Sequence, residues 1–126
     1  MGIDVYSRWK NQTQKEHDDQ CTGFSIHHGH VGYLREAYHG QPYATRMLVP
    51  EAFAADSDDD EPMIPAATMR KRLPGVIAAA IERAKNVYKE EIDENDPTVK
   101  SFVHFVELCE AKERETGIPC RIFASY

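Results

Sequence analysis

Two apolar stripes in the C-terminal half constrain the fold of this chain more than any other feature. The first runs along residues 77–88 and the second along residues 99–109, each at the helical period of about 3.6 residues. Such a stripe must be covered by another helix or by a sheet, because its apolar side chains would otherwise stay in water. We therefore expect a layered fold built around two long amphipathic helices.

The ends of these helices are marked by residue type. Asp96 and Pro97 have the N-cap and first-turn chemistry that begins a helix, and Gly117 is suited to the left-handed conformation that ends one. The earlier helix begins near residues 66–73. Pro74 then predicts either a kink in that helix or the first residue of a new one.

Short segments of alternating apolar and polar residues predict strands elsewhere. They cover residues 3–9, 24–28, 43–49 and 120–126. The first and last are expected to pair, since an isolated strand leaves its backbone groups unsatisfied. The predicted fold class is α+β, with a small, mainly antiparallel or mixed sheet and two long amphipathic helices packed on one face.

Two shorter helices are also predicted. Thr13 and Glu16 form a capping-box pattern, which predicts a polar helix that extends to about Asp19. Residues 31–39 carry apolar side chains at helical spacing, and Gly40 follows where a left-handed C-terminal cap is expected.

Length and charge limit the organisation and the partners. The 126 residues suit a single domain over 1–126, with a flexible acidic loop at residues 54–65. The net charge is −6, and five of the negative charges lie within residues 56–61, so the rest of the chain is close to neutral. Such a balance argues against nucleic acid as a partner, although the short basic run at residues 70–72 keeps that reading open.

We expect an untargeted chain. It shows no signal peptide and no apolar run near the roughly 20 residues of a membrane helix. Cys21, Cys109 and Cys120 follow no disulfide framework or metal spacing, and Cys109 is predicted to be a small buried core residue. Reduced thiols predict a cytoplasmic protein.

The most unusual segment for chemistry is the histidine-rich run at residues 27–30. His28 and His30 are two residues apart, so an extended backbone would place both rings on one face, as a metal-binding pair requires. His39 is the chosen candidate for a third ligand of a divalent transition metal such as zinc, and the alternatives are His104, Asp4 and the cysteines. The other reading is a turn whose imidazoles bond to the backbone or to water.

An anion pocket is a further candidate in the same region. Arg35 and His39 are four residues apart and share a face on the predicted helix. Together with His28 and His30 they would line a pocket for an anion or a phosphate. The competing interpretation is a solvated helix face.

Two segments of the chain resemble known sequences. The opening Met1-Gly2-Ile3-Asp4-Val5-Tyr6 and the stretch at residues 29–38 resemble small bacterial and phage-associated proteins of uncharacterised function. The resemblance implies a bacterial or prophage setting and supplies no catalytic residues.

We expect a cytoplasmic accessory protein that binds a protein partner or a small molecule without catalysis, and that needs no cofactor. The competing hypothesis is a metal- or histidine-dependent hydrolase centred on His28, His30 and His39, with Arg35 holding an anion. A homodimer is expected because two-fold dimers are the commonest oligomers.

Overall fold

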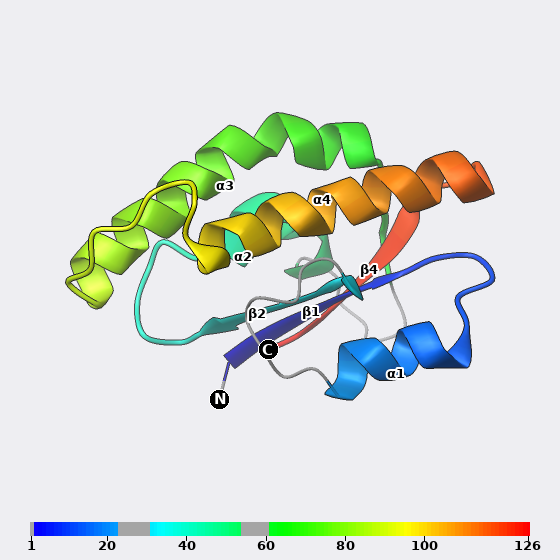
Figure 1. Ribbon diagram of the computed structural model, residues 1–126, viewed down its shortest axis with the longest axis horizontal. Coiled ribbons are helices and arrows are strands. Elements are labelled where there is room, and N and C mark those ends of the chain that lie inside the picture. The colour runs from blue at the N-terminus through cyan, green and yellow to red at the C-terminus, as the bar shows by residue number, and fades with distance from the viewer. Residues whose placement is uncertain (1, 23–30, 54–60) are drawn as a thin grey trace.

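The computed structural model describes residues 2–22, 31–53 and 61–126, and an antiparallel sheet lies at its centre (Figure 1). The sheet has four strands in the order β2-β1-β4-β3, so the first and last strands of the chain lie side by side in its middle. Asp4 of β1 is opposite Ser125 of β4, which confirms the predicted pairing of the two ends of the chain. The strands are β1 (Gly2–Arg8), β2 (Tyr33–Ala37), β3 (Met63–Ile64) and β4 (Cys120–Ser125).

The two long helices lie next to each other across one face of this sheet (Figure 1). Asp96 accepts a hydrogen bond from the backbone N–H of Thr98 at 2.9 Å, and Gly117 has φ 78°, so both predicted ends of the second long helix are confirmed. Pro74 lies inside the first long helix, which continues through it. The helices are α1 (Gln14–Thr22), α2 (Ala44–Leu48), α3 (Ala66–Val87) and α4 (Pro97–Thr116), with a 3-10 turn at Pro50–Phe53.

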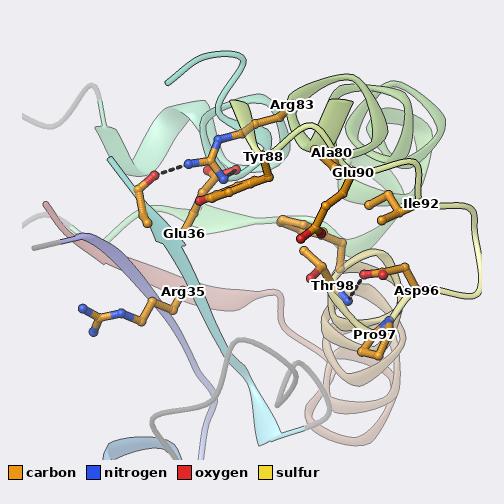
Figure 2. A pocket seen from close by; sticks show the side chains of 13 residues that line it. Arg35, Glu36, Ala80, Arg83, Tyr88, Glu90, Ile92, Asp96, Pro97 and Thr98 are labelled. Carbon is orange, nitrogen blue, oxygen red and sulfur yellow. Dashed lines mark hydrogen bonds and ion pairs between the residues drawn. The ribbon is translucent and has the colours of Figure 1, made fainter. Parts of the chain in front are cut away.

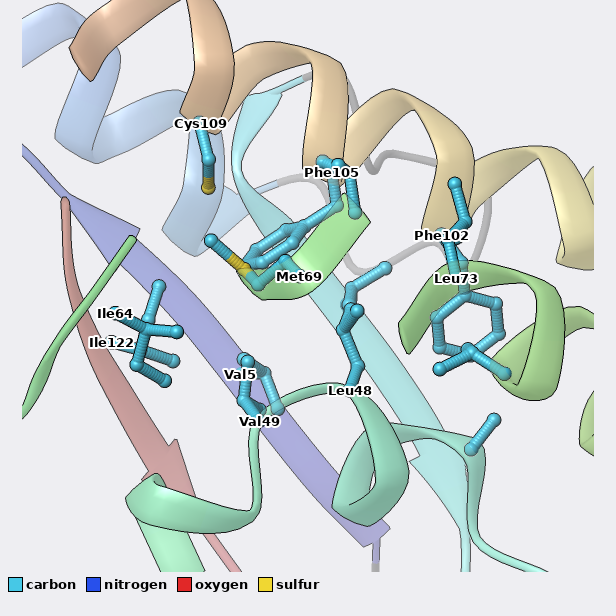
Figure 3. Packing of buried hydrophobic residues seen from close by; sticks show 14 of the residues in the cluster. Val5, Leu48, Val49, Ile64, Met69, Leu73, Phe102, Phe105, Cys109 and Ile122 are labelled. Atoms are coloured by element: carbon cyan, nitrogen blue, oxygen red, sulfur yellow. The ribbon is translucent and has the colours of Figure 1, made fainter. Parts of the chain in front are cut away.

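The core fills the space between the sheet and the two long helices. Val5 and Ile122 project from the sheet, and Met69 and Phe105 meet them from the helices (Figure 3). These side chains are almost fully buried, and each contributes about 1.5–3 kcal/mol to the free energy of unfolding. The α+β class, with both long helices on one face, is therefore confirmed.

The polar helix at the start of the chain is confirmed, and it is longer than predicted. Glu16 accepts a bond from the Thr13 N–H at 3.0 Å, and Thr13 Oγ1 accepts one from the Glu16 N–H at 3.1 Å. This reciprocal cap begins α1, which extends to Thr22 rather than to Asp19. The carboxylate of Glu16 also lies 3.3 Å from Lys112 Nζ, and this ion pair joins α1 to the last turns of α4.

The helix predicted over residues 31–39 is wrong, because this segment contains strand β2. Leu34 and Glu36 face the helices, whereas Tyr33 and Arg35 lie on the opposite face of the sheet. A buried glutamate occupies a position where the alternating pattern calls for an apolar residue. Because this charged residue interrupts the strand pattern and the neighbouring apolar residues have helical spacing, the sequence predicted a helix here.

The strand predicted over residues 43–49 is also wrong, because helix α2 lies there. The carboxylate of Glu36 accepts hydrogen bonds from the backbone N–H groups of Ala44 at 2.9 Å and Thr45 at 3.1 Å. These are first-turn N–H groups that have no partner within the helix. A side chain from another element thus caps α2, which local propensity does not reveal.

The predicted acidic loop at 54–65 includes one regular element. Met63 and Ile64 form strand β3, which pairs with Arg121 and Cys120 of β4. Residues 54–60 and the predicted strand at 24–28 lie outside the described residues.

Candidate functional site

A cleft of about 540 Å³ opens between β2, the end of α3 and the start of α4 (Figure 2). Its volume is in the range of small-molecule sites. Its apolar wall comes from four different segments of the chain. The apolar residues that line it are Ala37, Ala80, Ala84, Ile92, Pro97 and Phe102.

A buried ion pair forms the inner end of this cleft. Glu36 Oε2 lies 3.7 Å from Arg83 Nη1, and the two side chains are only 5% and 9% exposed. Arg83 also donates hydrogen bonds to the carbonyl oxygens of Gly40, at 2.7 Å, and Ala37. Glu36 accepts a further bond from Thr45 Oγ1 at 2.6 Å. Both charges are therefore engaged by the protein itself, as buried charges must be.

Tyr88, which is 41% exposed, lines the cleft beside this pair (Figure 2). Its ring centroid is 5.5 Å from the Arg83 guanidinium carbon, a cation–π distance. Its hydroxyl lies 2.8 Å from Nδ1 of His39, and the two rings meet edge to face. His39 is thus placed beside the cleft, through its contact with Tyr88.

Arg35 contributes to the wall of the cleft, but its guanidinium points away from it (Figure 2). Arg35 Nη1 lies 3.1 Å from Asp4 Oδ1 on the opposite face of the sheet. The hydroxyl of Tyr33 donates to the same oxygen at 2.6 Å. Burial and the hydrogen bond to Asp4 raise the pKa of Tyr33 to about 12.

The predicted common face of Arg35 and His39 is therefore wrong. The reason is that Arg35 lies on a strand that ends at Ala37, and not on a helix that continues to His39. His28 and His30, the other two predicted site residues, lie outside the described residues.

The rim of the cleft is acidic. Glu90 and Asp96 line it, and an adjoining hollow of about 450 Å³ shares Ile92 and Asp96 with it and adds Glu91 and Asp93. Because the two arginines of the cleft are already paired with Glu36 and Asp4, these carboxylates dominate the local charge. The signal was present in the sequence, where five carboxylates lie within residues 90–96.

The metal hypothesis gains no support from the described residues. In that part of the chain, no group of three or more His, Cys, Asp or Glu side chains is arranged to hold a metal ion. Because His28 and His30 lie outside it, a zinc site with His28, His30 and His39 stays a prediction.

The cysteine of α4 is part of the core, as predicted. Cys109 is 1% exposed, and its Sγ lies 3.4 Å from Ser7 Oγ. The hydrogen bond with the Cys120 thiol and burial raise the pKa of Cys109 well above its ordinary value, which keeps this thiol neutral.

Comparison with protein-family models, with curated proteins and with solved structures found no match. None of the described helices has the length and apolar character needed to cross a membrane. The function of this protein is therefore inferred from its own residues.

Proposed function

We propose that this protein binds a small organic cation, such as an alkylammonium compound, in the cleft between β2, α3 and α4, without a chemical step. One observation carries the proposal. The cleft has an apolar wall and a rim of carboxylates, while each of its arginines is already paired with another carboxylate.

The apolar wall suits the hydrocarbon part of such a ligand. Ala80, Ala84 and Phe102 would contact its methylene groups, and each buried CH₂ contributes about 0.8 kcal/mol. The partly exposed ring of Tyr88 offers a further apolar and cation–π contact at the mouth.

The rim suits the charged end of the ligand. An ammonium group has N–H donors and no acceptor, so carboxylates such as Glu90 and Asp96 are its natural partners. Asp96 Oδ1 already accepts from Thr98 N–H to cap α4, which makes Glu90 the residue more available to a ligand. The net charge of −6 adds a general attraction for cations.

The polar interior supports a binding role for the cleft. The hydrogen bonds of Glu36 and Arg83 are directed at the backbone of residues 37–45, so these two side chains fix the shape of the wall. A preformed wall lowers the ordering cost of binding.

Isothermal titration calorimetry with n-butylammonium and 1,4-diaminobutane tests this proposal, with n-butanol as the neutral control. We expect the cations to bind and butanol to bind at least about tenfold more weakly, and we expect binding to weaken as salt is raised. Amide shifts in NMR spectra should change at Ala80, Ala84 and Ile92.

Matched variants locate the site. Glu90→Gln removes one rim charge and is expected to weaken binding several-fold. Glu82→Gln removes an exposed α3 charge that does not line the cleft, and it should leave affinity unchanged. Equal binding of butanol and butylammonium, or shifts confined to residues outside the cleft, would show that the proposal is wrong. Titration with Nα-acetyl-lysine amide, which keeps its side-chain ammonium group, tests whether the lysine side chain of a protein partner also binds in the cleft.

The cytoplasmic setting, the bacterial or prophage origin and the homodimer stay predictions. Light scattering coupled to size-exclusion chromatography measures the mass in solution and tests the dimer directly.

A further inference from the structure

A second feature lies on a different surface, around helix α2 and the 3-10 turn that follows it. There the guanidinium of Arg46 lies close to three aromatic rings. One of these rings belongs to Tyr126, which is 56% exposed, and Met47, the next residue after Arg46 in the chain, is 43% exposed. We call this feature the Arg46 surface. It consists of Tyr43, Arg46, Met47, Phe53 and Tyr126, together with Tyr38, whose ring centroid lies 5.9 Å from that of Tyr43.

Three aromatic rings lie within cation–π distance of the guanidinium. Its carbon lies 4.9 Å from the ring centroid of Phe53, 5.5 Å from that of Tyr126 and 5.8 Å from that of Tyr43. Phe53 and Tyr126 are themselves in contact, with centroids 4.9 Å apart, and the Tyr126 hydroxyl donates to the Phe53 carbonyl oxygen at 3.2 Å. Arg46 is therefore positioned before any partner arrives.

Arg46 has no carboxylate partner within the described residues, unlike the arginines around it. Arg72 donates two hydrogen bonds to Glu51, and Arg83 is paired with Glu36. Cation–π contacts use the planar face of a guanidinium, whereas its N–H donors lie in the plane. Arg46 is also exposed, so the fork that binds carboxylates is available on it.

We propose that the Arg46 surface docks a protein partner through a segment in which Asp or Glu stands beside a large apolar residue. The carboxylate would accept from Arg46, and the apolar side chain would cover Met47 and Tyr126. Exposed Arg, Tyr and Met are the residue types enriched at the centres of protein interfaces.

A carboxylate fits this surface better than a phosphate. Arg46 is the single basic residue of this surface, and the neighbouring Arg72 and Arg83 are paired with carboxylates, whereas phosphate groups are usually held by clusters of basic residues. The charge preference is also opposite to that of the cleft, so the two sites would take different ligands.

Fluorescence anisotropy with defined peptides tests the proposal. The probe is a labelled peptide of sequence Gly-Glu-Phe-Glu-Leu-Glu-Gly, and its control replaces each Glu by Gln. We expect the wild-type protein to bind the acidic peptide at least about tenfold more tightly than the control. Arg46→Met should lower the affinity for the acidic peptide by about tenfold to a hundredfold, which is the range that the loss of a hydrogen bond to a charged group produces.

Two further variants complete the test. The first asks whether binding needs the bidentate guanidinium or only a positive charge, and the second is a control at another site. Arg46→Lys keeps the charge but loses the bidentate geometry, so it should recover only part of the affinity. Arg70→Met removes an exposed arginine of α3 that is paired with Glu110, and it should leave binding unchanged. Circular dichroism confirms that each variant is folded.

Three outcomes would overturn the proposal. The first is the absence of Arg46-dependent binding at peptide concentrations up to the millimolar range. The second is tighter Arg46-dependent binding of a phosphopeptide or of an oligothymidine than of the acidic peptide. The third is a gain of tenfold or more when Asp56, Asp58, Asp59 and Asp60 are changed to Asn, since the chain's own carboxylates would then be the ligand.

Discussion

Replacing Glu36 by Gln should destabilise this protein more than any comparable exchange of a surface glutamate. The variant keeps the size of the side chain but removes its charge and one of its two acceptor oxygens. In the wild type those oxygens serve the N–H groups of Ala44 and Thr45, the hydroxyl of Thr45 and the guanidinium of Arg83. The amide NH₂ group of the variant would face donors instead of acceptors.

The expected magnitude follows from these contacts. Hydrogen bonds to charged groups are worth about 1.5–3 kcal/mol each, and removing one partner of a buried ion pair costs about 3–5 kcal/mol. Glutamine can still accept one of the bonds, so we expect a loss of about 3 kcal/mol. Domains of this size are stable by about 5–15 kcal/mol, so the variant should still fold.

Urea denaturation followed by circular dichroism measures this loss. With a slope of about 2 kcal/mol per M, the unfolding midpoint should fall by about 1.5 M. Glu82→Gln is the matched control and should change the free energy of unfolding by less than about 0.5 kcal/mol, because Glu82 is an exposed residue on α3.

A double-mutant cycle isolates the contribution of the ion pair. Arg83→Met leaves the Glu36 charge buried without its cation, so it should also be costly. The double variant should lose at least about 1 kcal/mol less than the sum of the single losses. A loss below about 1 kcal/mol for Glu36→Gln, or strict additivity in the cycle, would refute the assignment of Glu36 and Arg83 as a coupled buried pair.

Further predictions concern pH and backbone strain. Because the folded-state pKa of Tyr33 is raised to about 12, stability should fall as pH rises above about 10, and Tyr33→Phe should flatten this alkaline decline in urea melts between pH 8 and 11. Gly32→Ala should cost more than about 1 kcal/mol in the same assay, because φ is +85° there and the added Cβ would lie 2.6 Å from Gln20 Nε2. Hydrogen bonding from Arg72 lowers the pKa of Glu51, so the stability from that pair should be lost as pH falls below about 4.5. Midpoints between pH 6 and 3 should show this loss, under about 1 kcal/mol for so exposed a pair, and Glu51→Gln should remove it.

The sequence predicted the parts of the fold whose signals are local. The cap at Asp96, the glycine at 117 and the reciprocal cap of Thr13 and Glu16 all satisfy backbone groups within a few residues. The apolar stripe of α4 likewise reports the face that this helix buries, whereas the stripe predicted for α3 is correct only in part: Ala80 and Ala84 are buried, but Tyr88 is 41% exposed. Such patterns can be recognised without knowledge of the tertiary structure.

The errors come from contacts between distant residues. Glu36 is a charged residue inside the sheet, and its partner Arg83 is 47 positions away, so no local rule identifies β2 or the cap of α2. For the same reason the cleft was missed, because β2, α3 and α4 meet there only after folding. The predicted site residue Arg35 was misplaced together with its strand.

The buried pair supports both proposed sites. Arg83 binds the carbonyls of Ala37 and Gly40, and Glu36 binds the N–H groups that begin α2, so residues 37–45 are fixed at both ends. That segment carries His39, which contacts Tyr88 at the cleft, and Tyr43, whose ring lies near both Arg83 and Arg46. A loss of the ion pair should therefore weaken cation binding in the cleft and docking at the Arg46 surface together, although Glu36 itself belongs only to the cleft. Glu90→Gln, in contrast, should affect the cleft alone, because the charge that it removes lies on the rim and supports no part of α2.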